Sequence, residues 1–170
     1  MDWDRAPDPG GLAILGHNGA GKTTFLHFLV GLLPPRCGHP FLAGWPQARP
    51  INTSRRVGFV PGSPRLDPRL TVDDHLHLAA AWTGVGNRSR AIGDARERAG
   101  VAALGARRAG KLSRGWRQRL MLAMALVGEP AILVLDEPFE GLDPFMRREM
   151  IATLAEFRTS GRLFLATHDL

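Results

Sequence analysis

The sequence predicts an α/β fold in which helices cover both faces of a mostly parallel sheet. Its strand-like segments are apolar at consecutive positions, which is typical of parallel strands buried on both faces. Helix-like segments alternate with these strands along the chain, and this alternation favours crossover connections. The strands are expected at residues 12–15, 56–61, 131–135 and 163–167, and the accompanying helices at 24–30, 113–127 and 144–159.

The segment that joins the first strand to the first helix has the pattern of a phosphate-binding loop. Gly16-His17-Asn18-Gly19-Ala20-Gly21-Lys22-Thr23 fits G-x-x-x-x-G-K-[ST]. Its glycines let backbone N–H groups approach phosphate oxygens, and the helix that follows adds its positive end. We expect Lys22 to reach the β- and γ-phosphates of a nucleotide and the Thr23 hydroxyl to bind Mg²⁺. The strand–loop–helix context therefore predicts a P-loop NTPase fold.

A pair of acids follows the strand at residues 131–135. Asp136 and Glu137 stand at its carboxyl end, where open α/β sheets bind their ligands. Asp136 is expected to hold Mg²⁺, directly or through a water, and Glu137 to orient or deprotonate a water that attacks the γ-phosphate. An exposed acidic turn before Pro138 is the alternative.

The middle of the chain, about residues 62–127, is expected to form a small helical subdomain inserted into a single domain of residues 1–170. Thr71 and Asp74 form a variant of the capping box at the start of one helix. The glycine-rich segment 84–87 ends this helix, and Ser89 is expected to cap a second one that runs to about residue 99.

Three further expectations concern local features. His75 and His77 are two residues apart, hence on different faces of a helix, and we expect both at the surface and neither as a metal ligand. Pro34-Pro35 is expected to stop the first helix, and residues 38–44 to form a short edge strand or hairpin. Ser113, with Gly115 two residues later, predicts another helix N-terminus suited to an anion, although a plain helix cap is the simpler interpretation of these residues alone.

Length and composition are those of a soluble globular domain. The 170 residues are 44% apolar and 22% charged, and the lone Cys37 excludes an internal disulfide. We find no signal-peptide pattern at Met1, and the longest apolar run, 120–127, is too short to span a bilayer. The net charge of +6 is spread over scattered arginine pairs, so no nucleic-acid partner is expected, whereas proximity to an anionic membrane surface fits.

Taken in order, these motifs resemble those of the nucleotide-binding domain of an ATP-binding cassette (ABC) transporter. Leu112 to Gly115 is similar to the family signature, residues 141–144 to the D-loop, and His168 to the switch histidine. The resemblance extends over nearly the whole chain, from Gly11 to Leu170.

The resemblance implies ATP as the nucleotide, Mg²⁺ as the metal, and a homo- or heterodimer with a second nucleotide-binding domain. Each ATP would lie between one phosphate-binding loop, with Thr24 beside it, and the partner's signature, so that Ser113 and Gly115 contact the γ-phosphate in trans. Asp143 would bridge across the dimer, and His168 would hold the γ-phosphate side of the transition state. Hydrolysis would drive a separate transmembrane permease subunit, with this chain peripheral at the cytoplasmic face of the membrane.

The chain departs from the family pattern in three places. Gly62 stands where the family usually has a glutamine that helps to ligate Mg²⁺, and Arg114 and Trp116 stand where glycine and glutamine are commonest. The chain is short at both ends, and Trp3 is not assigned the role of stacking on adenine. Two alternatives therefore stay open beside an exporter ATPase: a truncated cassette that binds ATP with little or no hydrolysis, and a soluble ABC ATPase that takes no part in transport.

Overall fold

The structure of the chain is a computed structural model that describes residues 11–33, 41–42, 45–46, 57–63 and 65–168. Five of its strands and helices carry or adjoin the predicted site residues at 16–24, 136–143 and 168: β1 (Gly11–Leu15), α1 (Lys22–Leu29), β5 (Ile132–Asp136), α5 (Pro144–Phe157) and β6 (Arg162–Thr167). The remaining strands are β2 (Phe41–Leu42), β3 (Trp45–Pro46) and β4 (Val57–Val60). The remaining helices are α2 (Val72–Thr83), α3 (Arg88–Arg98) and α4 (Arg114–Leu126), with short 3₁₀ turns at Ala102–Leu104 and Ala109–Lys111.

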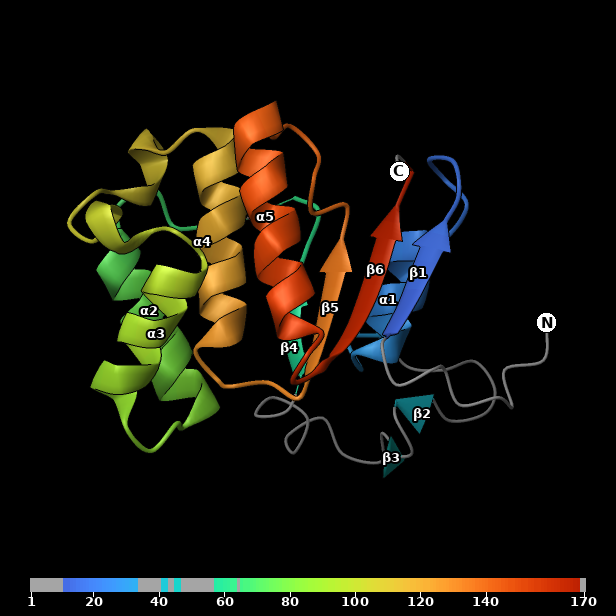
Figure 1. The fold of residues 1–170 in the computed structure, drawn as a ribbon, viewed down its shortest axis with the longest axis horizontal. Helices are drawn as coiled ribbons and strands as arrows, with labels where there is room; N and C mark the ends of the chain where they lie inside the picture. Colours follow the sequence, from blue (N-terminus) through green and yellow to red (C-terminus); the bar gives the residue numbers. More distant parts are fainter. Residues whose placement is uncertain (1–10, 34–40, 43–44, 47–56, 64, 169–170) are drawn as a thin grey trace.

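The main sheet is parallel throughout and has the strand order β1-β6-β5-β4. Helix α1 lies on one face of the sheet, and α4 and α5 lie on the other, with α2 and α3 beyond α4 (Figure 1). The predicted α/β fold with a mostly parallel sheet is therefore confirmed. All four strands end at the same edge, so the residues that follow β1, β5 and β6 are brought together there.

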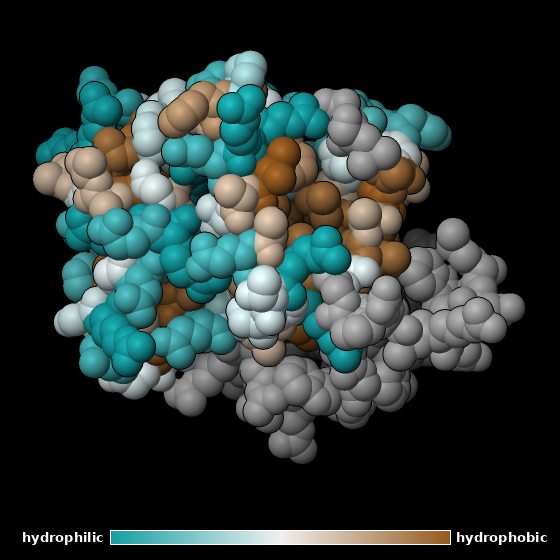
Figure 2. Space-filling model, viewed as in Figure 1, coloured by the Kyte–Doolittle hydropathy of each residue, from teal (hydrophilic) through white to brown (hydrophobic). Residues whose placement is uncertain are grey.

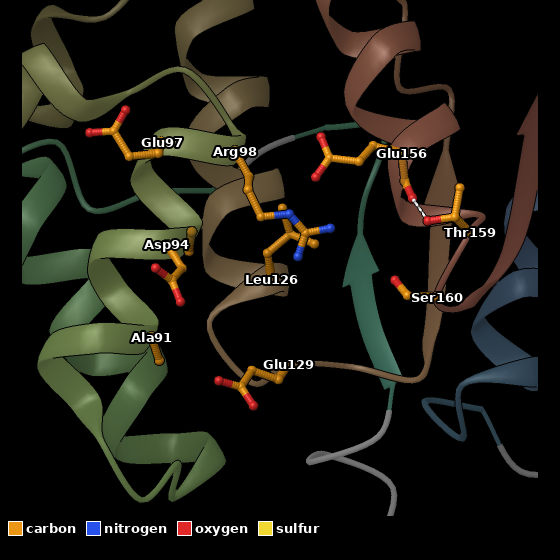
Figure 3. Close-up of a pocket in the computed structure, with 10 residues that line it drawn as sticks. Ala91, Asp94, Glu97, Arg98, Leu126, Glu129, Glu156, Thr159 and Ser160 are labelled. Atoms are coloured by element: carbon orange, nitrogen blue, oxygen red, sulfur yellow. Dashed lines mark hydrogen bonds between the residues drawn. The ribbon is translucent and has the colours of Figure 1, made fainter.

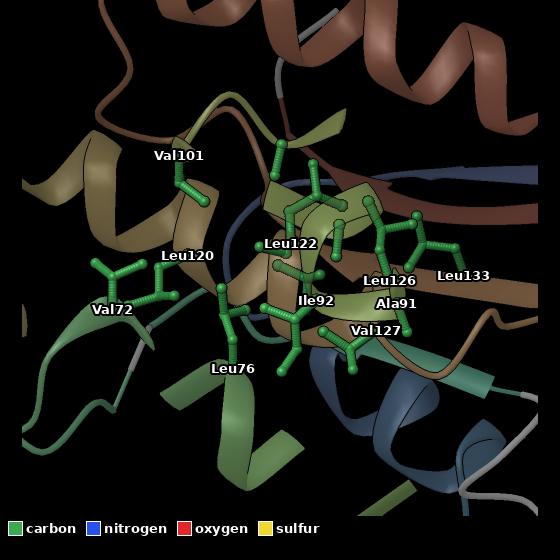
Figure 4. Packing of buried hydrophobic residues seen from close by; sticks show 14 of the residues in the cluster. Val72, Leu76, Ala91, Ile92, Val101, Leu120, Leu122, Leu126, Val127 and Leu133 are labelled. Atoms are coloured by element: carbon green, nitrogen blue, oxygen red, sulfur yellow. The ribbon is translucent and has the colours of Figure 1, made fainter. Parts of the chain in front are cut away.

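Two apolar cores hold these layers together. Leu26 and Leu29 of α1 pack against Ile132, Val134 and Phe164 on one face of the sheet. On the other face a larger cluster joins β5 to all the remaining helices (Figure 4) and includes Leu76, Ile92, Leu120, Leu126, Leu133 and Met150. The four consecutive apolar residues of β5 thus serve both cores, with Leu133 and Leu135 in one and Ile132 and Val134 in the other, and all four are buried.

The helical region is built around α4, which contacts β4 as well as α2 and α3. The expected helix over residues 113–127 is confirmed, with Ser113 as its N-cap and Val127 as its C-cap. Because α4 belongs to the packing of both regions, the boundary of the helical subdomain at about residues 62–127 stays a prediction.

The capping box at the start of α2 is confirmed. The amide of Asp74 donates to Oγ1 of Thr71 at 3.1 Å, and the amide of Thr71 donates to the Asp74 carboxylate at 2.9 Å. The carboxylate of Asp74 accepts from the Thr71 hydroxyl, at 2.7 Å, as well as from the Thr71 amide, and these two bonds lower the pKa of Asp74. The next expected cap was wrong, because Asn87 rather than Ser89 caps α3: its side chain accepts from the amide of Arg90 at 3.1 Å, so the helix begins at Arg88.

The expectation that His75 lies at the surface was also wrong. Its side chain is only 4% exposed, while His77 is exposed. His75 is three residues from Val72 and next to Leu76, and these positions form the buried stripe of α2 together with Ala80. Its Nδ1 lies 2.8 Å from the carbonyl oxygen of Thr71, which provides a partner for one ring nitrogen.

The structure also refines the regions on either side of α1 and β2. Helix α1 ends at Leu29, and Gly31 with φ of +79° turns the chain away before the proline pair, which itself lies outside the described residues. The hairpin alternative for the segment 38–44 is confirmed in part, since β2 pairs antiparallel with β3.

Apolar surface stays open on the face of the sheet that carries α5. Figure 2 shows hydrophobic side chains gathered over β1 and β6 and beside α5. Leu15 at the end of β1 is 53% exposed, and Ile151 on α5 is 48% exposed. Among the described helices, none combines the length and hydropathy that a bilayer span requires.

Candidate functional site

The loop between β1 and α1 has the conformation that its glycines make possible. Gly19 and Gly21 have φ values of +85° and +88°, in the left-handed region where a side chain is strained. Gly21 is also the N-cap residue of α1, so the helix begins at Lys22. The predicted loop residues His17, Asn18, Ala20 and Thr24 are exposed on this loop and on the first turn of the helix.

Lys22 lies under the loop and is 8% exposed. Its Nζ donates to the carbonyl oxygens of Gly16 at 2.5 Å and His17 at 3.1 Å. The same Nζ lies 3.2 Å from Oε1 of Glu137, forming an ion pair between the loop and the residue that follows β5. The fold therefore joins the two strongest motifs of the sequence, which are more than 100 residues apart.

Thr23 and Asp136 form a second link between the same two segments. The Thr23 hydroxyl donates to Oδ2 of Asp136 at 2.7 Å. Asp136 is 4% exposed, and its Oδ1 is buried without a hydrogen-bond partner. A buried carboxylate oxygen without a partner is costly unless a ligand completes it.

Glu137 is held from three sides. Its backbone has φ of +45°, rare for a residue with a side chain, and its amide donates to the carbonyl oxygen of Ala166 in β6 at 2.8 Å. Its Oε2 accepts from the amide of His168 at 3.2 Å and lies 2.9 Å from His168 Nδ1. Burial of the carboxylate raises the pKa of Glu137, but its contacts with Lys22 and His168 outweigh burial, so the pKa lies below its ordinary value.

Lys22, Thr23, Asp136, Glu137 and His168 thus form one connected cluster, which we call the acid–lysine cluster. The other predicted site residues lie outside it. Ser113 is the N-cap of α4 and accepts from the amide of Trp116 at 3.4 Å, while Asp143 is the N-cap of α5 and accepts from the amide of Met146 at 2.8 Å. Gly115 is buried where a Cβ would lie 2.8 Å from Sδ of Met146.

Gly62 lies beside the acid pair. A Cβ at this position would lie 3.2 Å from the carbonyl oxygen of Asp136 and 3.5 Å from Cβ of Glu137. A longer side chain at position 62 would therefore start next to both acids, as the family resemblance implies for its glutamine.

Sequence reasoning missed an apolar groove that lies where β4 begins and α1 ends, away from the edge at which the strands end. The groove has a volume of about 620 Å³ and is lined by the end of α1, by β4 and by α2 and α4, with Leu32, Phe59, Leu78, Trp82 and Met124 among its residues. Leu78 is 56% exposed and Trp82 82% exposed. They are four residues apart on α2 and off its buried stripe, and this spacing was the available signal.

A second hollow of about 450 Å³ lies between α3, the end of α4 and the end of α5 (Figure 3). Arg98 points into it, and its lining includes the acids Asp94, Glu97, Glu129 and Glu156. None of the predicted site residues lines either of these two hollows.

The comparisons with known proteins agree with this geometry. The family model described as ABC transporter matches residues 10–140. The Nod factor export ATP-binding protein I of Burkholderia thailandensis is 41% identical over 157 residues, which cover 91% of this chain and 52% of that protein. An uncharacterized ABC transporter ATP-binding protein of Bacillus subtilis, YxlF, is 36% identical over 161 residues, covering 94% of this chain and 53% of that protein.

Solved structures give the same result. One described as an ATP binding subunit of an ABC transporter matches with a TM-score of 0.84 and 30% identity, covering 95% of this chain and 69% of its own. CbiO1 of Clostridium perfringens, described as part of the ABC transporter complex CbiONQ, matches with a TM-score of 0.81 and 29% identity, covering 95% of this chain and 68% of its own. The chain spans about half the length of the curated relatives it matches. Since the family model covers well over half of its residues, this chain belongs to the ABC transporter family of ATP-binding proteins.

Proposed function

We propose that this chain binds ATP with Mg²⁺ at the edge where β1, β5 and β6 end, hydrolyses it, and drives a membrane permease subunit. The observation that carries the proposal is the acid–lysine cluster, in which Lys22 meets Glu137 and Thr23 meets Asp136. A lysine and a helix N-terminus suited to phosphate, beside two acids suited to a metal and a water, form the set that phosphoryl transfer requires.

Lys22 and the backbone of residues 16–21 would bind the phosphates of ATP. Lys22 is buried, so its charge acts in a medium less screened than water. Its present partners are two carbonyl oxygens and Glu137, and a γ-phosphate would compete with these for Nζ. Binding would therefore release Glu137 from Lys22 in the same step.

The residues beside the loop fit Mg²⁺. The oxygens of Thr23 and Asp136 are close enough to reach one cation, and Oδ1 of Asp136 is buried without a partner. In the described part of the chain no group of three or more His, Cys, Asp or Glu side chains could hold a metal ion, so phosphate oxygens and waters would complete the shell. When bound, Mg²⁺ would neutralise charge on the β- and γ-phosphates.

Glu137 would orient and deprotonate the attacking water. Because its pKa is held below the ordinary value, the carboxylate stays ionised at neutral pH and can accept a proton. His168, whose Nδ1 lies 2.9 Å from that carboxylate, would hold the γ-phosphate side of the transition state. Ser113 and Gly115 would contact the γ-phosphate of the partner's ATP across a head-to-tail dimer, and Asp143 would bridge across that dimer.

The apolar groove would receive the membrane subunit at the cytoplasmic face. It exposes Leu78 and Trp82 on the helical region, away from the nucleotide, and large exposed apolar side chains mark interaction surfaces. We expect Trp82→Ser to lower association with the membrane subunit about tenfold or more, as loss of one aromatic anchor does, and to leave ATP binding unchanged. Flotation of the chain with native membranes measures this, and Ile151→Ser, an exposed apolar residue outside the groove, is the control.

Cell fractionation separates a transport subunit from a soluble ABC ATPase. Recovery of the chain with membranes supports a transport subunit. Recovery with ribosomes or with DNA would instead favour a soluble ABC ATPase, the alternative that the sequence leaves open.

A second candidate function is ATP binding with little or no hydrolysis, and Gly62 is the observation that favours it. Position 62 lies beside Asp136 and Glu137 but provides no side-chain oxygen for a metal. We expect Gly62→Gln to raise Mg²⁺-dependent turnover about fivefold, equivalent to about 1 kcal/mol of activation free energy, the net worth of one hydrogen bond. Steady-state phosphate release measures this change.

The control for that experiment is Gly62→Ala. It adds the Cβ that would lie 3.2 Å from the Asp136 carbonyl oxygen without adding an amide, so it reports any steric effect alone. Equal rates for the parent chain and Gly62→Gln would indicate that the site works without a side-chain ligand at this position.

The proposed function as a whole is tested by ATP binding and by phosphate release from the purified chain, with and without Mg²⁺. Saturable ATP binding that depends on Lys22, with Mg²⁺-dependent release of phosphate, supports it. Binding without release supports the second candidate, and absence of binding by a folded sample excludes both.

A further inference from the structure

Arg114 connects two loops that the proposed function assigns to different ATP molecules. Its guanidinium forms an ion pair with Glu140, with Nη2 2.8 Å from Oε1, and the two side chains are 51% and 44% exposed. Arg114 lies in the signature segment at the start of α4, whereas Glu140 follows Glu137 by three residues. Under the proposed function, the signature segment faces the partner's ATP and Glu137 acts on the chain's own ATP. The Arg114–Glu140 contact therefore joins the signature segment to the turn that follows Glu137.

The contact is close-packed as well as ionic. Gly141 has φ of +73°, and a Cβ there would lie 2.6 Å from Cδ of Arg114 and 2.9 Å from its Nε. The next signature residue, Gly115, is packed in the same way, since a Cβ there would lie 2.8 Å from Sδ of Met146 and 3.2 Å from a methyl group of Leu142. The stem of Arg114 thus lies across the backbone at Gly141, so the start of α4 and the turn before α5 are in direct contact.

Glu140 is in turn connected to the backbone of Glu137. The amide of Glu140 donates to the carbonyl oxygen of Glu137 at 3.2 Å, and the amide of Leu142 donates to that of Phe139 at 3.2 Å. Glu137 itself has φ of +45°, a conformation that persists only where surrounding contacts enforce it. The turn of residues 137–142 therefore helps to fix the backbone conformation at Glu137, and Arg114 contacts that turn at Glu140 and Gly141.

We infer that Arg114 is a positioning residue that sets the geometry of Glu137 through Glu140 and Gly141. The inference rests on the proposed function, since it assigns a consequence to the signature segment's engagement with the partner's ATP. When that segment moves to meet a γ-phosphate, the Arg114–Glu140 contact transmits the movement to the turn that carries Glu137. Arg114 acts on the reaction through Glu140 and needs no contact with the nucleotide.

A charge-reversal cycle tests the inference. Arg114→Ala and Glu140→Ala are each expected to lower kcat about five- to tenfold with KM within about twofold of the parent, because the loss is confined to the transition state. The paired reversal, Arg114→Glu with Glu140→Arg, is expected to restore kcat to within about twofold of the parent, as coupled neighbours do. Arg90→Ala, which removes an exposed ion pair to Asp94 on α3, is the matched control and should leave kcat unchanged.

A second measurement does not depend on turnover. Hydrogen exchange of the peptide spanning residues 137–143 is expected to be faster in Arg114→Ala and Glu140→Ala than in the parent chain. It should return to the parent rate in the paired reversal, because the amides of Glu140 and Leu142 then regain their support. Exchange in α3 should remain unchanged in all these variants.

The outcomes separate the inference from the proposed function. If Arg114→Ala lowers kcat while Glu140→Ala does not, or if the paired reversal gives no recovery, Arg114 acts elsewhere and the inference is wrong. If the parent chain shows no turnover, the proposed hydrolysis fails, and exchange alone decides whether Arg114 supports the turn. Unchanged exchange in both single variants overturns the inference in either case.

Discussion

Replacing Glu137 by glutamine is expected to lower ATP turnover about 10³-fold, within the range that general-base catalysis contributes. Glutamine has nearly the same shape but cannot accept a proton from the attacking water. It also removes the negative charge that lies 3.2 Å from Nζ of Lys22. The γ-phosphate then no longer competes with a carboxylate for Lys22. ATP binding should therefore persist or tighten, and the nucleotide-bound dimer should accumulate.

Single-turnover phosphate release and gel filtration with ATP measure these two effects. Glu156→Gln is the matched control, since Glu156 lines the separate hollow near the end of α5 and should leave turnover unaltered. Persistent turnover in Glu137→Gln, together with a monomer in the presence of ATP, would remove Glu137 from the mechanism.

Replacing Arg119 by methionine is expected to lower the free energy of unfolding by about 3 kcal/mol, as loss of a buried charged network does. Arg119 is 3% exposed and joins three helices. Its guanidinium donates to the carbonyl oxygen of Ala99 after α3 at 3.1 Å, to that of Met146 in α5 at 3.2 Å, and to the carboxylate of Glu149 at 2.5 Å. Methionine keeps much of the volume but leaves two carbonyl oxygens without these donors.

Urea unfolding followed by circular dichroism measures the change. Arg90→Met is the control, because Arg90 is 75% exposed and its loss should alter stability by less than about 0.5 kcal/mol. Glu149 is 45% exposed, so water can solvate it in the variant. An unfolding free energy equal to that of the parent would mean that the cost of burying the guanidinium cancels the contacts it makes.

The local part of the fold was predictable because its signals lie within short stretches of sequence. Consecutive apolar residues predict strands such as β5 without information on the rest of the chain, since a strand buried on both faces has no polar side. The capping box of Thr71 and Asp74 and the cap at Ser113 were predictable for a similar reason, because their partners are three residues away. The placement of the cap at Ser89 was wrong because Asn87, two residues earlier, is an equally good cap and its side chain reaches Arg90.

The candidate site was predictable in its residues but not in its contacts. The positions of Lys22 and Asp136 follow from motifs that each stand at the end of a strand. The strand order β1-β6-β5-β4, which places β6 and His168 between the other two segments, depends on pairings between distant parts of the chain.

By itself, the amino-acid sequence determined the α/β class, the phosphate-binding loop and the two acids after β5, because each depends on residues that are neighbours in the chain. Only the tertiary structure decided that His75 is buried, that Leu78 and Trp82 border a groove, and that Arg114 meets Glu140. The reason is physical: burial and ion pairing depend on what a second, distant segment brings to the same place, and helical periodicity specifies a face without specifying what covers it.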